Sequence, residues 1–283
     1  MTEESTPTSG EPLGESTRST ADARASATRD DVVLGVENLT KSFGALVAVD
    51  GASFAVERGT VTGLIGPNGA GKSTLFDLVS GFYEPDAGSV EVNGADVAGD
   101  DPHEIAARGL IRTFQTPRRL EGMTVREAML VGPRRQPGES FRTLFTDPGA
   151  VRDHERRNLA AAERILEEFE IDHLATQPAT QISGGQLKLV ELARAMLADP
   201  DVLLLDEPAA GVNPTLRRRL VEQISRLNDD GTTFLLIEHD VEFVMELADP
   251  VIVLDRGSVL LEGSPEEVRR DDRVIDAYLG GGP

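Results

Sequence analysis

The 283-residue chain contains no cysteine, which excludes disulfide bonds, thiolate metal sites and cysteine nucleophiles. This absence fits a cytoplasmic protein. The chain also lacks long apolar segments. Its longest apolar runs, such as 202–205 and 234–237, are far shorter than the roughly 20 residues that a membrane-spanning helix needs. We therefore expect any role at a membrane to depend on a partner.

Lysine is scarce. The only lysines are Lys41, Lys72 and Lys188. In total the chain has 28 basic and 49 acidic residues, for a net charge of -21. Such a surface is tolerable in strong salt, because at about 1 M the Debye length is roughly 3 Å and carboxylate repulsion is screened. We therefore expect a salt-adapted source, with an acidic protein of ordinary salt as the alternative. The charge argues against nucleic acid as a partner and against direct binding to an anionic membrane.

The first thirty residues form a separate region. Residues 1–30 are rich in Ser, Thr, Glu, Ala, Pro and Gly, and they lack the apolar core of about 7 to 15 residues that a secretory signal requires. Their composition predicts a disordered acidic and polar tail.

The rest of the chain, 31–283, has the pattern of one α/β domain. Short β-like runs with Gly-containing turns fill its beginning, and the span of about 102–197 is mainly helical. Three fully apolar runs follow at 202–205, 234–237 and 251–254, each succeeded by helix or turn signals. This predicts a buried parallel sheet, an antiparallel β portion near the start and an inserted helical subdomain.

The most specific motif is Gly66-Pro-Asn-Gly-Ala-Gly-Lys-Ser73, which fits the phosphate-loop pattern Gly-x-x-x-x-Gly-Lys-Ser/Thr between an apolar strand and a helical run. Its glycines allow the backbone to surround phosphates at a helix N-terminus. Lys72 would reach the β- and γ-phosphates of ATP, and the Ser73 hydroxyl would bind Mg²⁺. The predicted phosphate-binding residues are Gly66, Pro67, Asn68, Gly69, Ala70, Gly71, Lys72, Ser73 and Thr74.

Polar side chains follow two of the apolar runs. Asp206 and Glu207 come directly after the run 202–205, at the sheet edge where α/β proteins bind ligands. Asp206 is suited to hold Mg²⁺, and Glu207 to accept a proton from the attacking water. His239 closely follows the next run and could bridge the γ-phosphate and that water. Together with the phosphate loop, these residues predict a P-loop NTPase.

A third motif narrows the family. Ile182-Ser-Gly-Gly-Gln186 precedes a helical run and resembles the signature motif of ABC ATPases, normally Leu-Ser-Gly-Gly-Gln. The resemblance implies a RecA-like core. It also implies that Ser183, Gly184, Gly185 and Gln186 face the γ-phosphate of a nucleotide held by an opposing subunit.

Other positions match the same family, and the resemblance spans 31–283. Gln115 takes the place of the glutamine that contacts Mg²⁺ and water, and Phe43 that of the aromatic ring stacked on adenine. Phe43 could instead be an ordinary packed phenylalanine. Asn213 stands where many ABC proteins have Asp, which leaves its role open.

The chain resembles most the larger ATPase subunit of branched-chain amino-acid importers. The residues that carry this are Arg112-Thr-Phe-Gln115, Met123-Thr-Val125, Asp206-Glu-Pro-Ala-Ala-Gly211 and Ile237-Glu-His-Asp240. The resemblance implies a second ATPase subunit, identical or different, permease subunits in the membrane and, indirectly, a solute-binding protein. The chain would lie on the cytoplasmic side of the membrane. Related ATPases serve urea or short-chain amide uptake, so the solute stays open.

Two other classes of protein are weighed against this reading. A soluble ABC ATPase of DNA repair would carry long coiled coils, and one of translation would usually carry two ATPase domains. The chain has neither pattern. A module that binds ATP without hydrolysing it would be expected to lack Glu207 or His239, and both are present.

Overall fold

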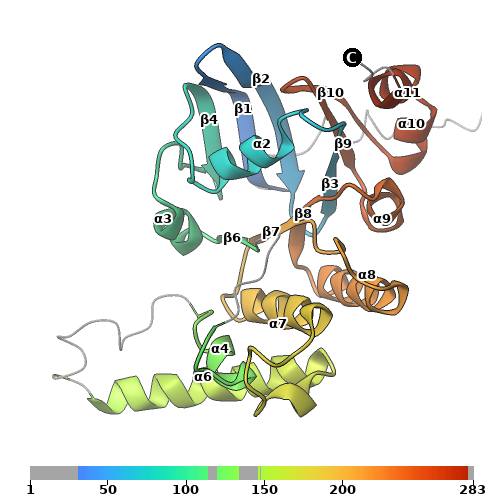
Figure 1. The fold of residues 1–283 in the computed structure, drawn as a ribbon. Helices are drawn as coiled ribbons and strands as arrows, with labels where there is room; N and C mark the ends of the chain where they lie inside the picture. Colours follow the sequence, from blue (N-terminus) through green and yellow to red (C-terminus); the bar gives the residue numbers. More distant parts are fainter. Residues whose placement is uncertain (1–30, 114–119, 134–145, 147, 280–283) are drawn as a thin grey trace, which may run out of the picture.

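The computed structural model describes residues 31–113, 120–133, 146 and 148–279 (Figure 1). The expected tail, 1–30, and Gln115 lie outside these residues. The described part of the chain forms two β-sheets with helices packed on them (Figure 1).

The first sheet is antiparallel and has the strand order β2-β1-β4-β5. Its strands are β1 (Val32–Phe43), β2 (Leu46–Glu57), β4 (Ala87–Val92) and β5 (Ala95–Asp96). The β1–β2 hairpin closes at Gly44, whose φ of 62° is readily adopted by glycine. The predicted antiparallel β portion near the start of the chain is confirmed.

The second sheet has six strands in the order β10-β9-β3-β8-β7-β6. They are β3 (Val61–Ile65), β6 (Leu110–Arg112), β7 (Val202–Asp206), β8 (Thr233–Ile237), β9 (Val251–Asp255) and β10 (Ser258–Gly263). All neighbouring strands pair in parallel except β10, which is antiparallel to β9. The predicted parallel core sheet is therefore confirmed.

Helices connect these strands. They are α2 (Lys72–Val79), α3 (Pro102–Ala107), α4 (Val125–Met129), α6 (Pro148–Glu168), the 3₁₀ turn η3 (Asp172–Leu174), α7 (Gly184–Met196), α8 (Pro214–Asp229), α9 (Val241–Leu247), α10 (Pro265–Arg270) and α11 (Asp272–Leu279). The span 102–197 holds the helices from α3 to α7, and it also contributes strand β6 to the core sheet.

The central strands of the six-stranded sheet, β3, β7, β8 and β9, are buried on both faces, which is why they are largely apolar. On β7, Leu203 and Leu205 belong to one core cluster, which includes the inner face of α7. Val202 and Leu204 belong to the other, which includes α2 and the antiparallel sheet. Since alternate residues of a strand point to opposite faces, α2 and α7 lie on opposite sides of this sheet.

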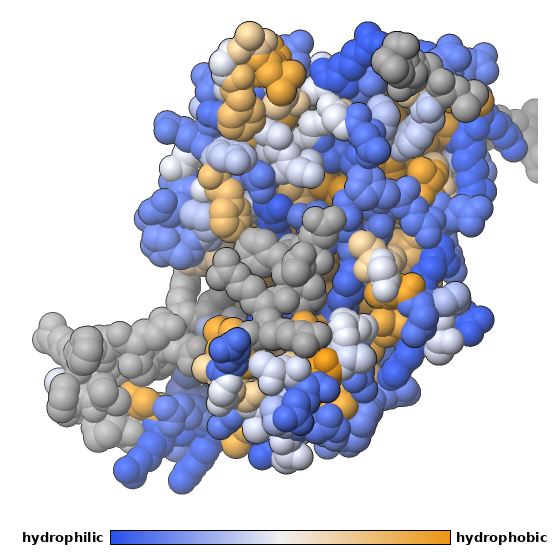
Figure 2. All heavy atoms as spheres, in the orientation of Figure 1, coloured by the Kyte–Doolittle hydropathy of each residue, from blue (hydrophilic) through white to orange (hydrophobic). Residues whose placement is uncertain are grey.

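The visible surface is largely hydrophilic, with separate apolar patches (Figure 2). Phe43, Phe82 and Tyr83 are among the exposed large apolar side chains. Within the described ranges, no helix combines the length and the hydrophobicity needed to span a bilayer.

Candidate nucleotide-binding site

The phosphate loop, 66–71, joins the buried strand β3 to helix α2. Two of its glycines are required by the fold. A Cβ at Gly66 would lie 2.1 Å from the carbonyl oxygen of Leu254, and a Cβ at Gly71 would lie 2.3 Å from that of Ala48. Gly71 is the N-cap of α2 with φ 101° and offers no side-chain acceptor. The first N–H groups of the helix are therefore suited to receive an anion.

Lys72 lies curled into this loop. Its Nζ donates to the carbonyl oxygens of Gly66, at 2.7 Å, and Pro67, at 3.1 Å. Burial lowers the pKa of Lys72, and the charge of Glu207 opposes this shift. The Lys72 ammonium therefore donates to backbone carbonyl oxygens of the loop, and phosphate oxygens could take their place when ATP binds. Ser73 and Thr74 follow it in the first turn of α2, with Ser73 exposed.

Asp206 ends strand β7 and is held by an arginine that sequence reasoning did not assign to the site. Arg112 donates to Asp206 Oδ2 at 2.8 Å, and its other terminal nitrogen donates to Asp77 Oδ1 at 2.7 Å and Ser80 Oγ at 2.9 Å. Arg112 therefore connects the end of α2 to the metal-binding carboxylate predicted at Asp206. The signal in the sequence was its place in the motif Arg112-Thr-Phe-Gln115, shortly before a residue that was assigned to the site.

Glu207 and His239 meet although they follow different strands. His239 Nε2 lies 2.5 Å from Glu207 Oε1, within hydrogen-bonding distance. Glu207 is 8% exposed, and its backbone has the left-handed φ of 49°. Its N–H donates to the carbonyl oxygen of Ile237, and its own carbonyl accepts from Lys188 Nζ at 3.0 Å.

Glu238 is a second residue that sequence reasoning missed, although it stands next to His239 in the quoted motif. It is 3% exposed, and its carboxylate accepts from the backbone N–H of Ala209 at 2.5 Å and of His239 at 3.2 Å. Burial raises the pKa of Glu238, and these two N–H groups oppose the rise. A buried acidic group therefore lies directly behind the Glu207–His239 pair.

The signature residues start helix α7. Ser183 is the N-cap: its hydroxyl accepts from the Gln186 N–H at 3.2 Å, and the Gln186 side chain accepts from the Ser183 N–H at 2.9 Å. Gly184 is exposed, and a Cβ there would meet nothing within 4 Å, whereas one at Gly185 would lie 2.3 Å from the Leu216 side chain. Because α7 and α2 lie on opposite faces of the sheet, one chain does not bring these residues to its own phosphate loop.

The remaining predicted residues lie elsewhere. Phe43 ends β1, is 43% exposed and packs edge-on against Tyr83 with ring centroids 5.3 Å apart. Asn213, whose role the sequence left open, is the N-cap of α8, where its Oδ1 accepts from the Leu216 N–H at 2.9 Å. Gln115 lies outside the described residues.

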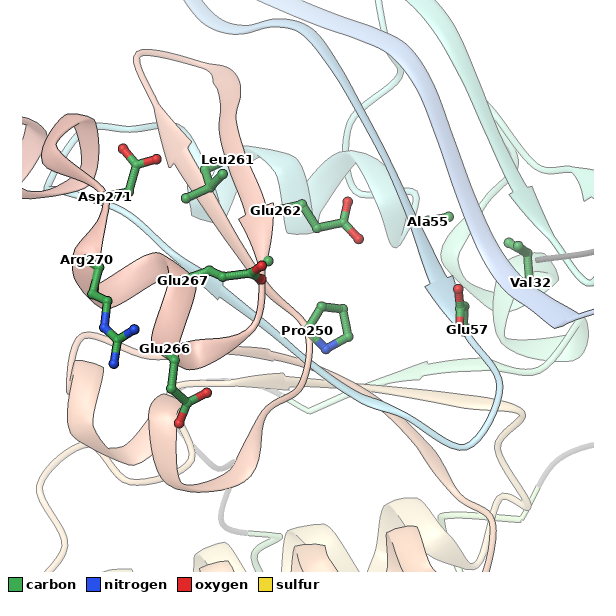
Figure 3. Close-up of a pocket in the computed structure, with 11 residues that line it drawn as sticks. Val32, Ala55, Glu57, Pro250, Leu261, Glu262, Glu266, Glu267, Arg270 and Asp271 are labelled. Atoms are coloured by element: carbon green, nitrogen blue, oxygen red, sulfur yellow. The ribbon is translucent and has the colours of Figure 1, made fainter. Parts of the chain in front are cut away.

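Two cavities lie near the edge of the fold. One of about 490 Å³ borders the phosphate loop and is lined by Pro67–Ala70 and by side chains of α11. On α11, burial raises the pKa of Tyr278, and the nearby Gly66 backbone opposes this rise. A larger groove of about 890 Å³ has acidic side chains from β2, β10 and α10 around it and holds none of the predicted site residues (Figure 3).

The sequence pattern of the family described as "ABC transporter" matches residues 49–210, and that of "Branched-chain amino acid ATP-binding cassette transporter" matches 258–283. The chain is 41% identical over 248 residues to a protein of Archaeoglobus fulgidus named "Probable branched-chain amino acid transport ATP-binding protein LivG", covering 88% of this chain and 95% of the relative. It is also 41% identical over 250 residues to "High-affinity branched-chain amino acid transport ATP-binding protein BraF" of Pseudomonas aeruginosa, covering 88% of this chain and 98% of the relative.

A solved structure described as a nucleotide-free ATP-binding cassette from an ABC transporter superposes with a TM-score of 0.76 at 38% identity, covering 87% of this chain and 98% of that one. A second, of an ATP-binding cassette in its ADP conformation, has a TM-score of 0.76 at 38% identity and covers 88% and 99% of the two chains. The fold, the phosphate loop and these relatives lead to one conclusion. The chain belongs to the ABC transporter family, as an ATP-binding and ATP-hydrolysing subunit.

Proposed function

We propose that the chain energises the import of branched-chain amino acids or similar small solutes. The observation that carries this proposal is the pair of matches, to relatives named for branched-chain amino-acid transport along nearly their whole length and to the family pattern at 258–283. Import of urea or short-chain amides is the alternative, since the solute is chosen by other subunits.

The residues of the site fit ATP with Mg²⁺. The Ser73 hydroxyl and the Asp206 carboxylate are hard oxygen donors of the kind that Mg²⁺ prefers, with Gln115 as a further predicted ligand. Mg²⁺ would neutralise charge on the phosphates. The loop 66–74 would bind these phosphates, Phe43 would stack on adenine, and Glu207 would accept a proton from the attacking water, with His239 beside it.

Two subunits acting together would complete each site. Helices α2 and α7 start on opposite faces of one sheet, and Gly184 borders open space. A head-to-tail dimer would place Ser183–Gln186 of one subunit against the nucleotide on the phosphate loop of the other. ATP contacts made only in the closed dimer would favour closure, and hydrolysis would release it.

Membrane partners would convert this motion into transport. The chain would lie on the cytoplasmic side of the membrane, attached to permease subunits that work with a solute-binding protein. Arg112 ties Asp206 to α2 and is followed closely by Gln115, which supports this segment as the path from the nucleotide to the inserted span 102–197. The charge of -21 supports a salt-rich environment.

The first test is ATP hydrolysis by the full chain and its Glu207→Gln variant, in potassium chloride from about 0.1 to 3 M. Turnover should fall about 10²- to 10⁴-fold in the variant, the usual size of a general-base contribution, while ATP binding is retained. The variant should also form a dimer when ATP is added. Glu246→Gln, in an exposed pair with Arg217, is the matched control. Unchanged turnover in Glu207→Gln would remove Glu207 from this role.

A second test addresses the solute. The chain, its permease subunits and their solute-binding protein would be reconstituted in liposomes. We expect leucine to stimulate ATP hydrolysis. Stimulation by urea or acetamide and not by leucine would favour the alternative.

A further inference from the structure

The backbone of Glu207 adopts a left-handed conformation, which residues with a Cβ disfavour. Its φ of 49° places a residue with a Cβ in the left-handed region, so surrounding contacts must hold it. Two of these involve its own backbone. The N–H donates to the carbonyl oxygen of Ile237 on β8, and the carbonyl accepts from Lys188 Nζ on α7 at 3.0 Å. The orientation of this side chain therefore depends on contacts with other elements.

Lys188 lies in the first turns of the helix that begins with the signature residues. It is one of three lysines in the chain, and it is half-buried. Burial lowers its pKa, and the carboxylates of Glu238, Glu207 and Glu191 oppose that shift. Lys188 and Glu191 of α7 line a small cavity of about 20 Å³ together with Asp206 and Glu207. Lys188 therefore joins the signature helix to the predicted catalytic glutamate of the same chain.

Glu238 fixes both partners of the Glu207–His239 pair. One carboxylate oxygen accepts from the Ala209 N–H, in the loop directly after Glu207, and the other accepts from the His239 N–H. Because Glu238 is 3% exposed, solvent does not compete with these bonds. The buried carboxylate thus connects the loop after β7 to the loop after β8.

We propose that Lys188 and Glu238 are positioning residues that hold Glu207 and His239 in their reactive geometry. Through Lys188, the signature helix of a subunit is connected to the glutamate of that same subunit. Contact between the signature helix and a nucleotide on a second subunit would then change the position of the first subunit's own Glu207. This inference rests on the proposed function, because it assigns Glu207 to proton transfer.

Steady-state hydrolysis of the full chain tests the proposal. Lys188→Met and Glu238→Gln should each lower kcat about 10- to 100-fold, the size expected for a small misplacement of a reacting group. The KM for ATP should stay within about twofold, since neither residue contacts the phosphate loop. Lys188→Arg keeps the charge and the donors and should restore most of the turnover. Glu246→Gln is the control for loss of a surface carboxylate.

Two further measurements separate positioning from a general loss of stability. If Lys188 and Glu238 act as one unit, kcat of the double variant should be close to that of the worse single variant, whereas independent effects would multiply. In the nucleotide-free chain, hydrogen exchange at 207–210 should accelerate in both single variants and stay unchanged at 66–75. This readout does not need hydrolysis.

The outcomes are distinguishable. If Glu207→Gln abolishes turnover while Lys188→Met and Glu238→Gln leave kcat and exchange at 207–210 as in the wild type, the positioning role is wrong and the proposed function stands. Multiplying effects on kcat would also overturn the shared role. If Glu207→Gln has no effect on turnover, the proposed role of Glu207 in proton transfer fails, and the positioning role fails with it.

Discussion

The two helix starts that are predicted to meet ATP, at α2 and at α7, are built differently. Helix α2 follows Gly71, which has no side chain to cap the first N–H groups, so they are open to an external anion. Helix α7 follows Ser183, and reciprocal bonds between Ser183 and Gln186 satisfy the N–H groups of these two residues internally. The first start has no side-chain cap on its N–H groups, whereas the second already uses the N–H groups of Ser183 and Gln186 in its own cap.

The glycines at these two helix starts differ in the space around them: Gly71 is closely packed within its own chain, and Gly184 is not. Gly71 is demanded by its own fold, because a Cβ would meet the carbonyl oxygen of Ala48 at 2.3 Å. A Cβ at Gly184 would meet nothing within 4 Å of the same chain. The first glycine is therefore explained by the chain alone. The second fits a need to approach something outside it.

The largest expected effect comes from Gly71→Ala. A left-handed residue with a Cβ, pressed on a backbone oxygen, should lower the free energy of unfolding by about 3 to 4 kcal/mol and abolish ATP binding. Urea unfolding in high salt and equilibrium nucleotide binding would measure this. A loss below about 1 kcal/mol would show that the loop can rearrange and that the contrast with Gly184 is weaker than the geometry indicates.

Gly184→Ala should separate function from folding. Alanine at an exposed first helical position should change the free energy of unfolding by less than about 0.5 kcal/mol. ATP binding to the single chain should be unchanged, while turnover falls about tenfold because the partner's phosphate can no longer approach closely. Wild-type turnover in this variant would argue against a second nucleotide at this helix start.

Ser183→Ala removes the capping hydroxyl and should cost about 1 kcal/mol of unfolding free energy. Ser264→Ala, at the start of α10, is a matched control because Ser264 and Glu267 form the same kind of capping box. Both variants should lose similar stability in urea unfolding. Only Ser183→Ala should also lower turnover. Equal turnover in the two variants would reduce Ser183 to a structural cap.

The smallest effect concerns protons at Lys72. Burial holds its pKa below the usual 10.5 in the free chain, and phosphates would raise it by favouring the charged form. ATP binding should therefore take up protons between the lowered and the raised pKa, and affinity should fall as the pH rises through this window. Calorimetry in two buffers of different ionisation enthalpy measures the uptake. Lys72→Met should abolish it.

The same shift has the opposite sign for folding. A lysine whose pKa is lower in the folded than in the unfolded state binds fewer protons, on average, when the chain is folded. The free chain should therefore lose stability as the pH falls from 10.5 through the lowered pKa. Unfolding of the wild type and of Lys72→Met across this window would test the sign.

Much of the fold could be predicted from the sequence because its signals are local. The fully apolar runs at β7, β8 and β9 follow from burial of both sheet faces, and the phosphate loop is a single strand-loop-helix unit. The pattern Ser183 to Gln186 likewise contains its own helix cap. In each case, neighbours in the sequence supply the hydrogen bonds or the apolar surface that form the structure.

Tertiary structure alone decided how these pieces meet. Arg112 and Asp206 are 94 positions apart, and Lys188 and Glu207 are 19 apart, so no local pattern announces either contact. Burial made Glu238 part of the site, since a carboxylate removed from water must find donors, and it found them on two different loops. The sequence by itself determined which groups could bind and cleave ATP. Packing around the sheet determined which of them are held together, and it left the signature helix on the face opposite helix α2.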